Sequence, residues 1–168
     1  MKYIKLLVVF IAFTSCVEVE FKSPMPSKGS KLDKLPEDLI SYFMSLDKDS
    51  AGNNKLNLNE LNSDFDWNEP LPEDVILKKW KHKYFLNQKG DNFWQIIMIK
   101  PEPNNSFGVY QLDGNEPRVI AELKSITKVE EFFNEDGDLD RVVLDPSLKE
   151  FKKIIKSNAF EKIDLFED

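Results

Sequence analysis

The chain has 168 residues and a single cysteine, Cys16, so no disulfide bond can form within it. A chain of this length buries enough surface on folding to form one domain with a substantial hydrophobic core. Packing and hydrogen bonding must therefore stabilise the fold without covalent cross-links, even in an oxidising compartment. The place of the cysteine is informative as well, because it closes an N-terminal segment that differs from the rest of the chain.

This N-terminal segment has the layout of an export signal. Lys2 and Lys5 give it a basic start, and residues 6–13 form an unbroken apolar run. The run is shorter than the roughly 20 apolar residues that a membrane-spanning helix needs, and the small residues at its exit favour cleavage. Its end, Phe-Thr-Ser-Cys at residues 13–16, resembles the lipobox of bacterial membrane lipoproteins, with phenylalanine in place of the usual leucine.

The lipobox resemblance implies that residues 1–15 are a signal peptide and that the thiol of Cys16 carries a diacylglyceryl group through a thioether. A further acyl chain on the new N-terminus would make the attachment to the bilayer effectively permanent. The alternative is an ordinary secretory signal that happens to contain a cysteine. Val17 stands where an aspartate commonly retains such lipoproteins in the inner membrane, which implies the outer membrane. Glu18 and Glu20 resemble acidic surface-export tags, so both the periplasmic and the surface face stay open.

The charge balance excludes some partners. The chain carries 23 Lys and Arg against 30 Asp and Glu, a formal net charge of -7, and removal of Lys2 and Lys5 makes it 21 minus 30, or -9. Nucleic-acid affinity comes largely from basic side chains that neutralise phosphates, so a nucleic-acid partner is not expected. The negative net charge also argues against a general preference for anionic membrane surfaces.

The composition changes near residue 36. Residues 16–35 are rich in proline, serine and lysine and show little periodicity, which predicts the lipidated cysteine followed by a flexible tether with a span of roughly 25 Å. Residues 36–168 are predicted to form a single globular, sheet-rich domain. It opens with Pro36 and apolar residues near helical spacing as far as Leu46, which indicates a helix, with a first strand as the alternative.

The middle of this domain reads as a β meander. Short segments rich in β-branched and aromatic residues alternate with turn residues. The expected strands are Val75 to Trp80, Lys83 to Leu86, Phe93 to Lys100, Phe107 to Leu112 and Arg118 to Leu123. Asp113-Gly114 is a hairpin signal between the last two, and residues 87–92 are a longer loop of the same kind.

The last fifty residues indicate helices. Thr127 and Glu130 have the spacing of a capping box, which predicts a short helix ending near Gly137. A second helix is expected from Asp145 and Pro146 through Ile155, followed by an edge strand within residues 159–166. The fold class is therefore predicted as α+β, a mainly antiparallel β meander with one or two C-terminal helices.

At this level of detail the chain resembles a group of small, sheet-rich bacterial lipoproteins without assigned function. The resemblance spans most of the mature chain, implies a compact sheet domain and brings no catalytic residue. It is carried by Phe21, Pro24, Pro26, Leu35-Pro36, Leu39, Tyr42, Lys83 to Asn87, Trp94, Asp145-Pro146 and Phe151.

Catalytic motifs are not visible in the sequence. The chain has one histidine, His82, no Gly-x-Ser-x-Gly, no His-Glu-x-x-His and no phosphate-binding glycine loop. We therefore do not expect an enzyme, although acidic chains always offer carboxylate pairs of the kind that hydrolases use.

Two acidic loops are candidates for calcium, which prefers several oxygen ligands on a turn. The first, starting at Asp47 and Asp49, lacks the closing glutamate of an EF-hand. The second alternates its oxygens through Asp136, Asp138 and Asp140, but Gly137 is misplaced for that loop. Solvated turn residues are the alternative for both, and no other cofactor is expected.

Aromatic residues offer a candidate binding surface. Trp67, Trp94 and Tyr84 would form one if they proved exposed side by side, whereas core packing is the simpler explanation. We expect a lipoprotein of the cell envelope that acts as a binding or structural module, with an envelope protein or a small ligand as partner. The alternatives are a lipocalin-like ligand-binding sheet and a carboxylate-based hydrolase.

Overall fold

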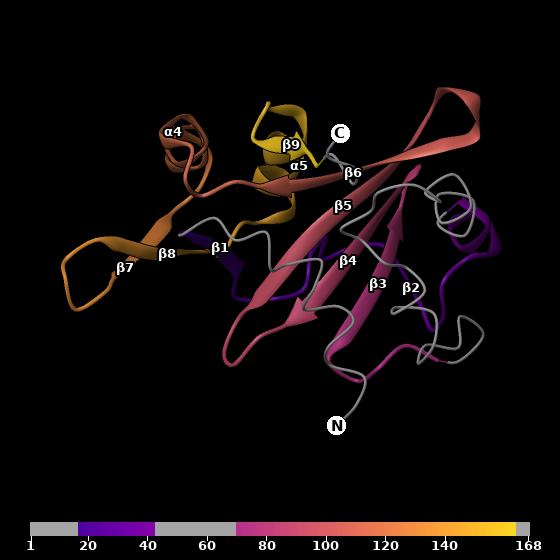
Figure 1. The fold of residues 1–168 in the computed structure, drawn as a ribbon, viewed down its shortest axis with the longest axis horizontal. Helices are drawn as coiled ribbons and strands as arrows, with labels where there is room; N and C mark the ends of the chain where they lie inside the picture. Colours follow the sequence, from indigo (N-terminus) through magenta and orange to yellow (C-terminus); the bar gives the residue numbers. More distant parts are fainter. Residues whose placement is uncertain (1–16, 43–69, 164–168) are drawn as a thin grey trace, which may run out of the picture.

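The computed structural model describes residues 17–42 and 70–163 (Figure 1). Residues 37–42 are helical. The other elements, in chain order, are β1 (Glu18–Phe21), β2 (Ser30–Leu32), β3 (Val75–Trp80), β4 (Lys83–Lys89), β5 (Trp94–Glu102), the 3-10 turn Pro103–Asn105, β6 (Ser106–Leu112), α4 (Pro117–Ile126), β7 (Val129–Phe133), β8 (Leu139–Leu144), α5 (Leu148–Lys156) and β9 (Phe160–Lys162).

The strands form one branched sheet. Its main path runs β2-β3-β4-β5-β1-β8-β7, and β6 pairs with β5 and with β9. The branch lies at β5, where Trp94 pairs with β1 while residues 98–102 pair with β6. All pairs are antiparallel except β1 with β8, which is parallel. The predicted α+β class with a mainly antiparallel sheet is confirmed.

This sheet is open over the described ranges. β2 and β7 end the main path and β9 ends the branch, so the strands do not close on themselves. The lipocalin-like alternative calls for a closed sheet around a ligand cavity. The observed topology gives it no support.

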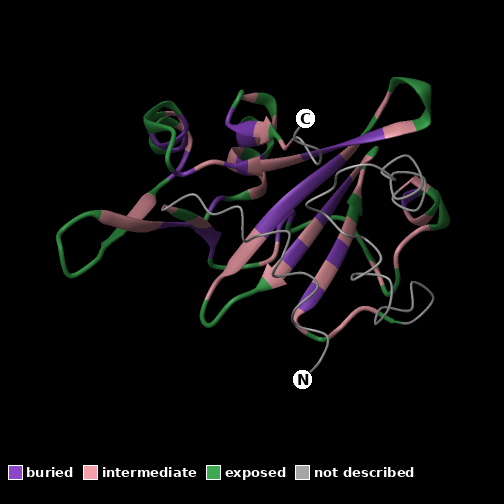
Figure 2. Cartoon of the chain, in the orientation of Figure 1, coloured by how far each residue is buried: buried purple, intermediate pink, exposed green. Residues whose placement is uncertain are grey.

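Both faces of the central strands are covered, and their side chains alternate between two hydrophobic clusters. Figure 2 shows that much of β5 is buried. Ile96 and Met98 of β5 face the cluster beneath α4 and α5, which includes Phe21, Phe85 and Phe151. Ile97 and Ile99 face the other cluster, beneath the helical turn at 37–42, from which Leu39 is fully buried. Because successive strand residues point to opposite faces, burial on both sides explains the continuous apolar run in β5.

The prediction of a flexible tether is wrong for much of residues 17–35. β1 is an interior strand between β5 and β8, and β2 pairs with β3. The segment between them is fixed as well, because Met25 is buried in the core and its N–H donates to the side chain of Asn87 at 2.7 Å. Lys78 donates to the carbonyl oxygens of Pro24 and Pro26, both at 2.9 Å. A proline-rich composition is compatible with an ordered path when buried side chains satisfy its backbone.

The prediction of a strand from Arg118 to Leu123 is wrong. These residues belong to α4, which begins with Pro117 at its first position and buries Val119, Ile120 and Leu123 on one face. Their spacing of one and four residues fits a helix, and packing on the sheet overrides the strand propensity of the β-branched residues. Asp113-Gly114 accordingly leads into a helix, so the hairpin predicted there is also wrong.

The prediction of a helix from Thr127 to Gly137 is wrong too. Thr127 ends α4, since its N–H donates to the carbonyl of Leu123. The residues that follow form the β7–β8 hairpin, with Gly137 at a φ of +87° in its turn. Pairing of β8 with its hairpin partner β7 and with the distant β1 outweighs the capping pattern.

The other predicted elements are confirmed. Four expected strands correspond to β3, β4, β5 and β6, although β4 continues to Lys89, into the loop predicted at residues 87–92. The helix near Pro36 is present over residues 37–42, and β9 forms an edge in the tail. The last helix is α5, but its N-cap is Ser147 and its capping box joins Ser147 to Glu150, in place of the expected Asp145 cap. The part of the first helix beyond residue 42 lies outside the described residues.

Candidate functional site

The predicted lipidation site, Cys16, lies outside the described residues, but its neighbour Val17 has a defined place. Val17 packs against Gly114 in the loop between β6 and α4. A Cβ on Gly114 would lie 3.0 Å from the Cβ of Val17 and closer still to its carbonyl oxygen. The close approach requires a glycine at this position. The start of β1 is thus held against the body of the domain.

β1, β8 and β7 place residues from three parts of the chain in one row. Glu18 is in register with Arg141, and Arg141 is in register with Phe132. The next row back along β8 pairs Leu139 with Phe133, across an irregularity that skips Asp140. Figure 1 shows the β7–β8 hairpin projecting from the rest of the sheet, so this row lies on a protruding part of the molecule.

Glu20 is the one charged residue that is buried in the described ranges, with 4% of its surface exposed. It forms an ion pair with Arg141 at 3.4 Å, and its carboxylate lies beneath Gly90 in the β4–β5 loop. Burial raises the pKa of Glu20, against the opposing effect of Arg141. A buried carboxylate that is paired with an arginine is suited to holding the β4–β5 loop and β8 together.

We expect Arg141→Gln to destabilise the protein in a pH-dependent way. Since the folded pKa of Glu20 lies above its ordinary value, its contribution to stability is greatest at low pH and falls as the pH rises through the folded pKa. Loss of Arg141 leaves the buried charge of Glu20 unpaired at pH 7, which costs about 1–3 kcal/mol of folding free energy. The cost is much smaller near pH 4, because Glu20 is then largely protonated. Urea unfolding at both pH values measures the difference.

Glu20→Gln in the same protein is the matched control. The double variant carries no buried charge, so most of the pH 7 penalty of Arg141→Gln should disappear. An equal penalty at both pH values, or in both backgrounds, would show that Arg141 acts through packing instead of through its charge.

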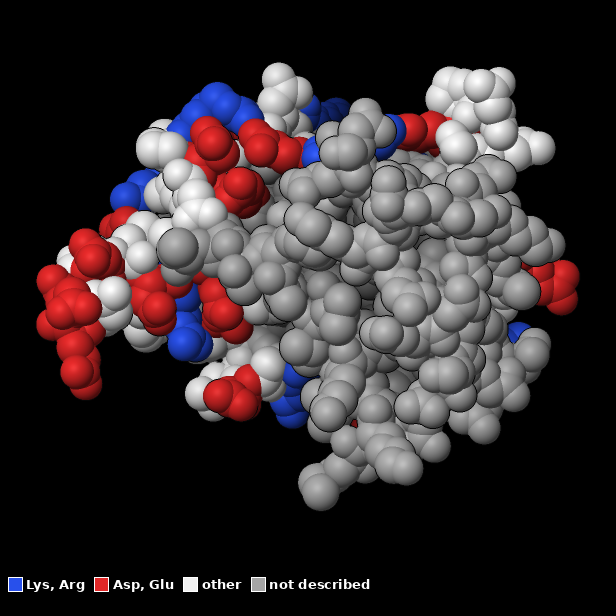
Figure 3. Space-filling model, viewed as in Figure 1, with Lys and Arg blue, Asp and Glu red and all other residues white. Residues whose placement is uncertain are grey.

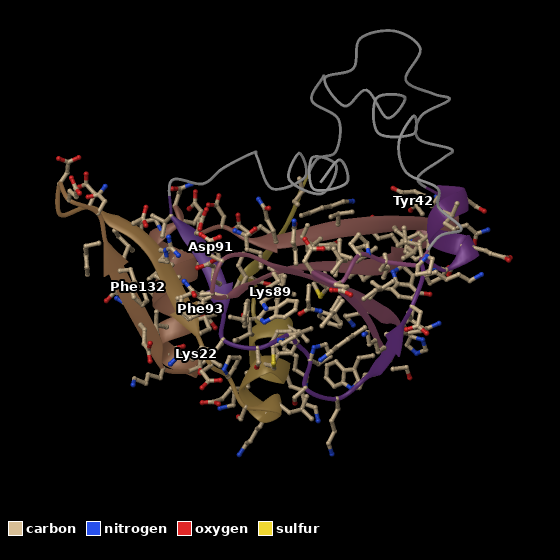
Figure 4. All side chains as sticks on the ribbon, turned by 90° about the horizontal axis from the view of Figure 1, so that it is seen from below. Lys22, Tyr42, Lys89, Asp91, Phe93 and Phe132 are labelled. Carbon is tan, nitrogen blue, oxygen red and sulfur yellow. The ribbon has the colours of Figure 1, made fainter. Side chains whose placement is uncertain are left out.

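Aromatic side chains lie on the same part of the sheet. The ring centroids of Phe93 and Phe132 are 6.2 Å apart. Figure 4 shows the two side chains beside one another, near Asp91 and Lys22. Lys22 in turn pairs with Glu130 of β7 at 2.8 Å, which lowers the pKa of Glu130 and raises that of Lys22. The ring contact attaches β7 to the loop before β5, and the ion pair attaches it to the chain just after β1. Phe132 and Phe133 nevertheless remain 41% and 61% exposed.

The structure does not bring the predicted aromatic binding residues together. Tyr84 is buried in the cluster with Ile97, whereas Trp94 packs against the opposite cluster, so the two lie on different faces of the sheet. They also lie at opposite ends of β4, because Tyr84 pairs with Ile99 and Trp94 pairs with Lys89. A shared binding surface of Tyr84 and Trp94 is therefore wrong. Trp67 lies outside the described residues.

The predicted calcium loop at Asp136, Asp138 and Asp140 is the turn of the β7–β8 hairpin. The side-chain oxygen of Asn134 accepts hydrogen bonds from the N–H groups of Asp136 and Asp138, while Asp140 lies 3.5 Å from Arg141. Over residues 17–42 and 70–163, no three His, Cys, Asp or Glu side chains gather closely enough to hold a metal ion. The first acidic loop, at Asp47 and Asp49, lies outside these ranges.

Sequence reasoning missed the functional interest of β1 and β7. The signal for β1 was present, because residues 17–21 read Val-Glu-Val-Glu-Phe, a period-two alternation typical of a half-buried strand. The two adjacent phenylalanines of β7 were assigned to a helix. Their exposure follows from the position of β7 at the sheet edge, which depends on pairing with a distant segment.

Comparisons of the chain with protein-family models, with curated proteins and with solved structures find no match. In the portion of the chain that the structure describes, no helix is both long and apolar enough to cross a bilayer.

Proposed function

We propose that this chain is a lipoprotein of the bacterial cell envelope, anchored by acyl chains on Cys16, whose sheet domain acts as a binding or structural module. The observation that carries the proposal is the pattern of residues 1–16: two lysines, an apolar run and a single cysteine after small residues. That cysteine is the one thiol in the chain, and thioether formation requires a thiol.

The position of the fold relative to Cys16 supports this proposal. β1 begins at Glu18, two residues after the cysteine, and its Phe21 lies in the hydrophobic core. Cleavage before Cys16 would therefore leave β1 whole. The domain needs no disulfide, which agrees with a cysteine committed to lipid. Val17 after the cysteine favours the outer membrane over the inner membrane.

We expect Cys16→Ala to abolish acylation and to move the protein out of the lipid-anchored fraction. Two or more acyl chains give stable anchoring, whereas one is marginal and none gives no anchor. Metabolic labelling with a radioactive fatty acid and partition into detergent measure the change. Ser23→Ala, a substitution of an exposed residue just after β1, is the control and should label like the unaltered chain. Label retained by Cys16→Ala would contradict the proposal.

A further inference from the structure

Phe132 and Phe133 are the exposed large hydrophobic side chains of the described chain. They are consecutive residues of β7, which is the last strand on the main path of the sheet and has one unpaired edge. Exposed aromatic residues at such an edge often mark a contact with another surface. The register of the sheet indicates which surface.

Phe132 lies close to the start of β1. Phe132 is opposite Arg141, and Arg141 is opposite Glu18, so Phe132 lies two strands from Glu18. Two strand spacings amount to about 10 Å. Cys16 precedes Glu18 by two residues, which reach at most about 7 Å.

The direction of β1 relates its first residue to one end of the hairpin. β1 and β8 are parallel, so the chain before Glu18 leads away from Val142 and toward the end of β8 at which Leu139 pairs with Phe133. The expected tether of roughly 25 Å is replaced by the single residue Val17, itself packed on Gly114. An acylated Cys16 would thus hold the β7 edge near the headgroups.

We propose that the free edge of β7 forms, with the lipid on Cys16, the surface through which the domain rests on its own membrane. The sheet would meet the headgroup region edge-on, so that Phe132 and Phe133, which project from opposite faces of the strand, both enter it. This inference rests on the proposed lipid anchor. Interfacial aromatic side chains insert roughly 5–10 Å into this boundary, where apolar rings are removed from water. The bilayer is the occupant because the covalent anchor already places it within reach of the rings.

Charge disfavours a second copy of the chain as the occupant. Glu130 and Glu131 of β7 are paired with Lys22 and Lys124, but the adjoining turn carries Glu135, Asp136 and Asp138 without a basic residue. A second copy would add the negative charge of a second such turn, and like charges on adjacent strands are destabilising. Figure 3 shows the acidic side chains gathered at this end of the molecule. The same charge predicts that the rings enter zwitterionic bilayers more readily than anionic ones.

The test compares two variants of the lipidated protein, each with one residue replaced by tryptophan. Each variant is reconstituted in vesicles of phosphatidylcholine that carries bromine on the upper part of its acyl chain. Phe133→Trp places an indole on the proposed surface. Lys31→Trp places one on exposed β2, four strands from β1 on the main path of the sheet. Both variants keep Trp67, Trp80 and Trp94, so the difference between them reports the added indole.

On the brominated vesicles we expect the tryptophan emission of Phe133→Trp to shift to the blue and to lose intensity. We expect neither change for Lys31→Trp. The loss should diminish when phosphatidylglycerol replaces phosphatidylcholine. Equal spectra for the two variants, on vesicles that float with acylated protein, would overturn the inference while leaving the anchor intact. A dimer that shields the added indole from bromine would overturn it as well. Absence of acylation, seen in the mass, would instead refute the proposed function.

Discussion

Phe151→Ala is expected to lower the free energy of unfolding by about 3–5 kcal/mol, the cost of removing a buried phenylalanine from a packed core. Phe151 has no exposed surface and projects from α5 onto the sheet. The centroid of its ring lies 5.5 Å from that of Phe85 in β4 and 6.0 Å from that of Phe21 in β1, and the contact with Phe21 is edge to face. The residue therefore joins the C-terminal helix to the first strand of the domain, and no disulfide compensates for its loss.

Phe133→Ala is the matched control for this prediction. The same atoms are removed, but Phe133 is 61% exposed, and surface substitutions generally change stability by no more than about 0.5 kcal/mol. Urea unfolding of the detergent-solubilised lipoprotein, followed by circular dichroism, compares the two. Equal losses for both variants would show that the arrangement of α5 on the sheet is incorrect.

Asn87→Ala is expected to cost about 2–4 kcal/mol, because it leaves buried backbone groups without partners. Asn87 is fully buried, accepts the N–H of Met25 at 2.7 Å, and donates to the carbonyls of Phe85 and Ile76 at 3.0 and 3.2 Å. Its loss should free the segment between β1 and β2. Limited proteolysis should then cut near Lys28 faster than in the unaltered chain.

Asn92→Ala, in the exposed loop that follows β4, serves as the comparison. It should change neither the stability nor the rate of cleavage near Lys28. Unaltered proteolysis of Asn87→Ala would contradict the role of Asn87 in ordering this segment, and the flexible tether that its composition suggests would then be the better description.

Local sequence patterns predicted the centre of the sheet well. β3 to β6 are joined by short turns and carry apolar residues on both faces, so the pattern of each strand is sufficient to identify it. The errors occur where a pattern has two interpretations. Val119, Ile120 and Leu123 favour a strand by residue type and a helix by spacing, and only the surface they cover decides between these.

The errors around β1, β7 and β8 have a different cause. β1 and β8 are more than a hundred residues apart in the chain, and their parallel pairing cannot be inferred from either segment alone. Without β8 as a partner, Thr127 and Glu130 resemble a capping box and the residues after Cys16 resemble a linker. Long-range pairing of this kind outweighs local preference once both partners bury side chains.

The candidate site likewise has one part that the sequence predicts and one part that requires the structure. Cys16 and its proposed chemistry follow from sixteen consecutive residues, because an export signal is recognised as a linear pattern. The proximity of Phe132 to Glu18, on which the further inference depends, follows from the register of three strands. The buried pair of Glu20 and Arg141 depends on the same register, and therefore also required the structure.

The most direct test of the central claim is the intact mass of the protein purified from membranes. We expect a chain that begins at Cys16, 168 minus 15 or 153 residues long, with the added mass of a diacylglyceryl group and an N-linked acyl chain. An unmodified Cys16 still preceded by residues 1–15 would contradict it.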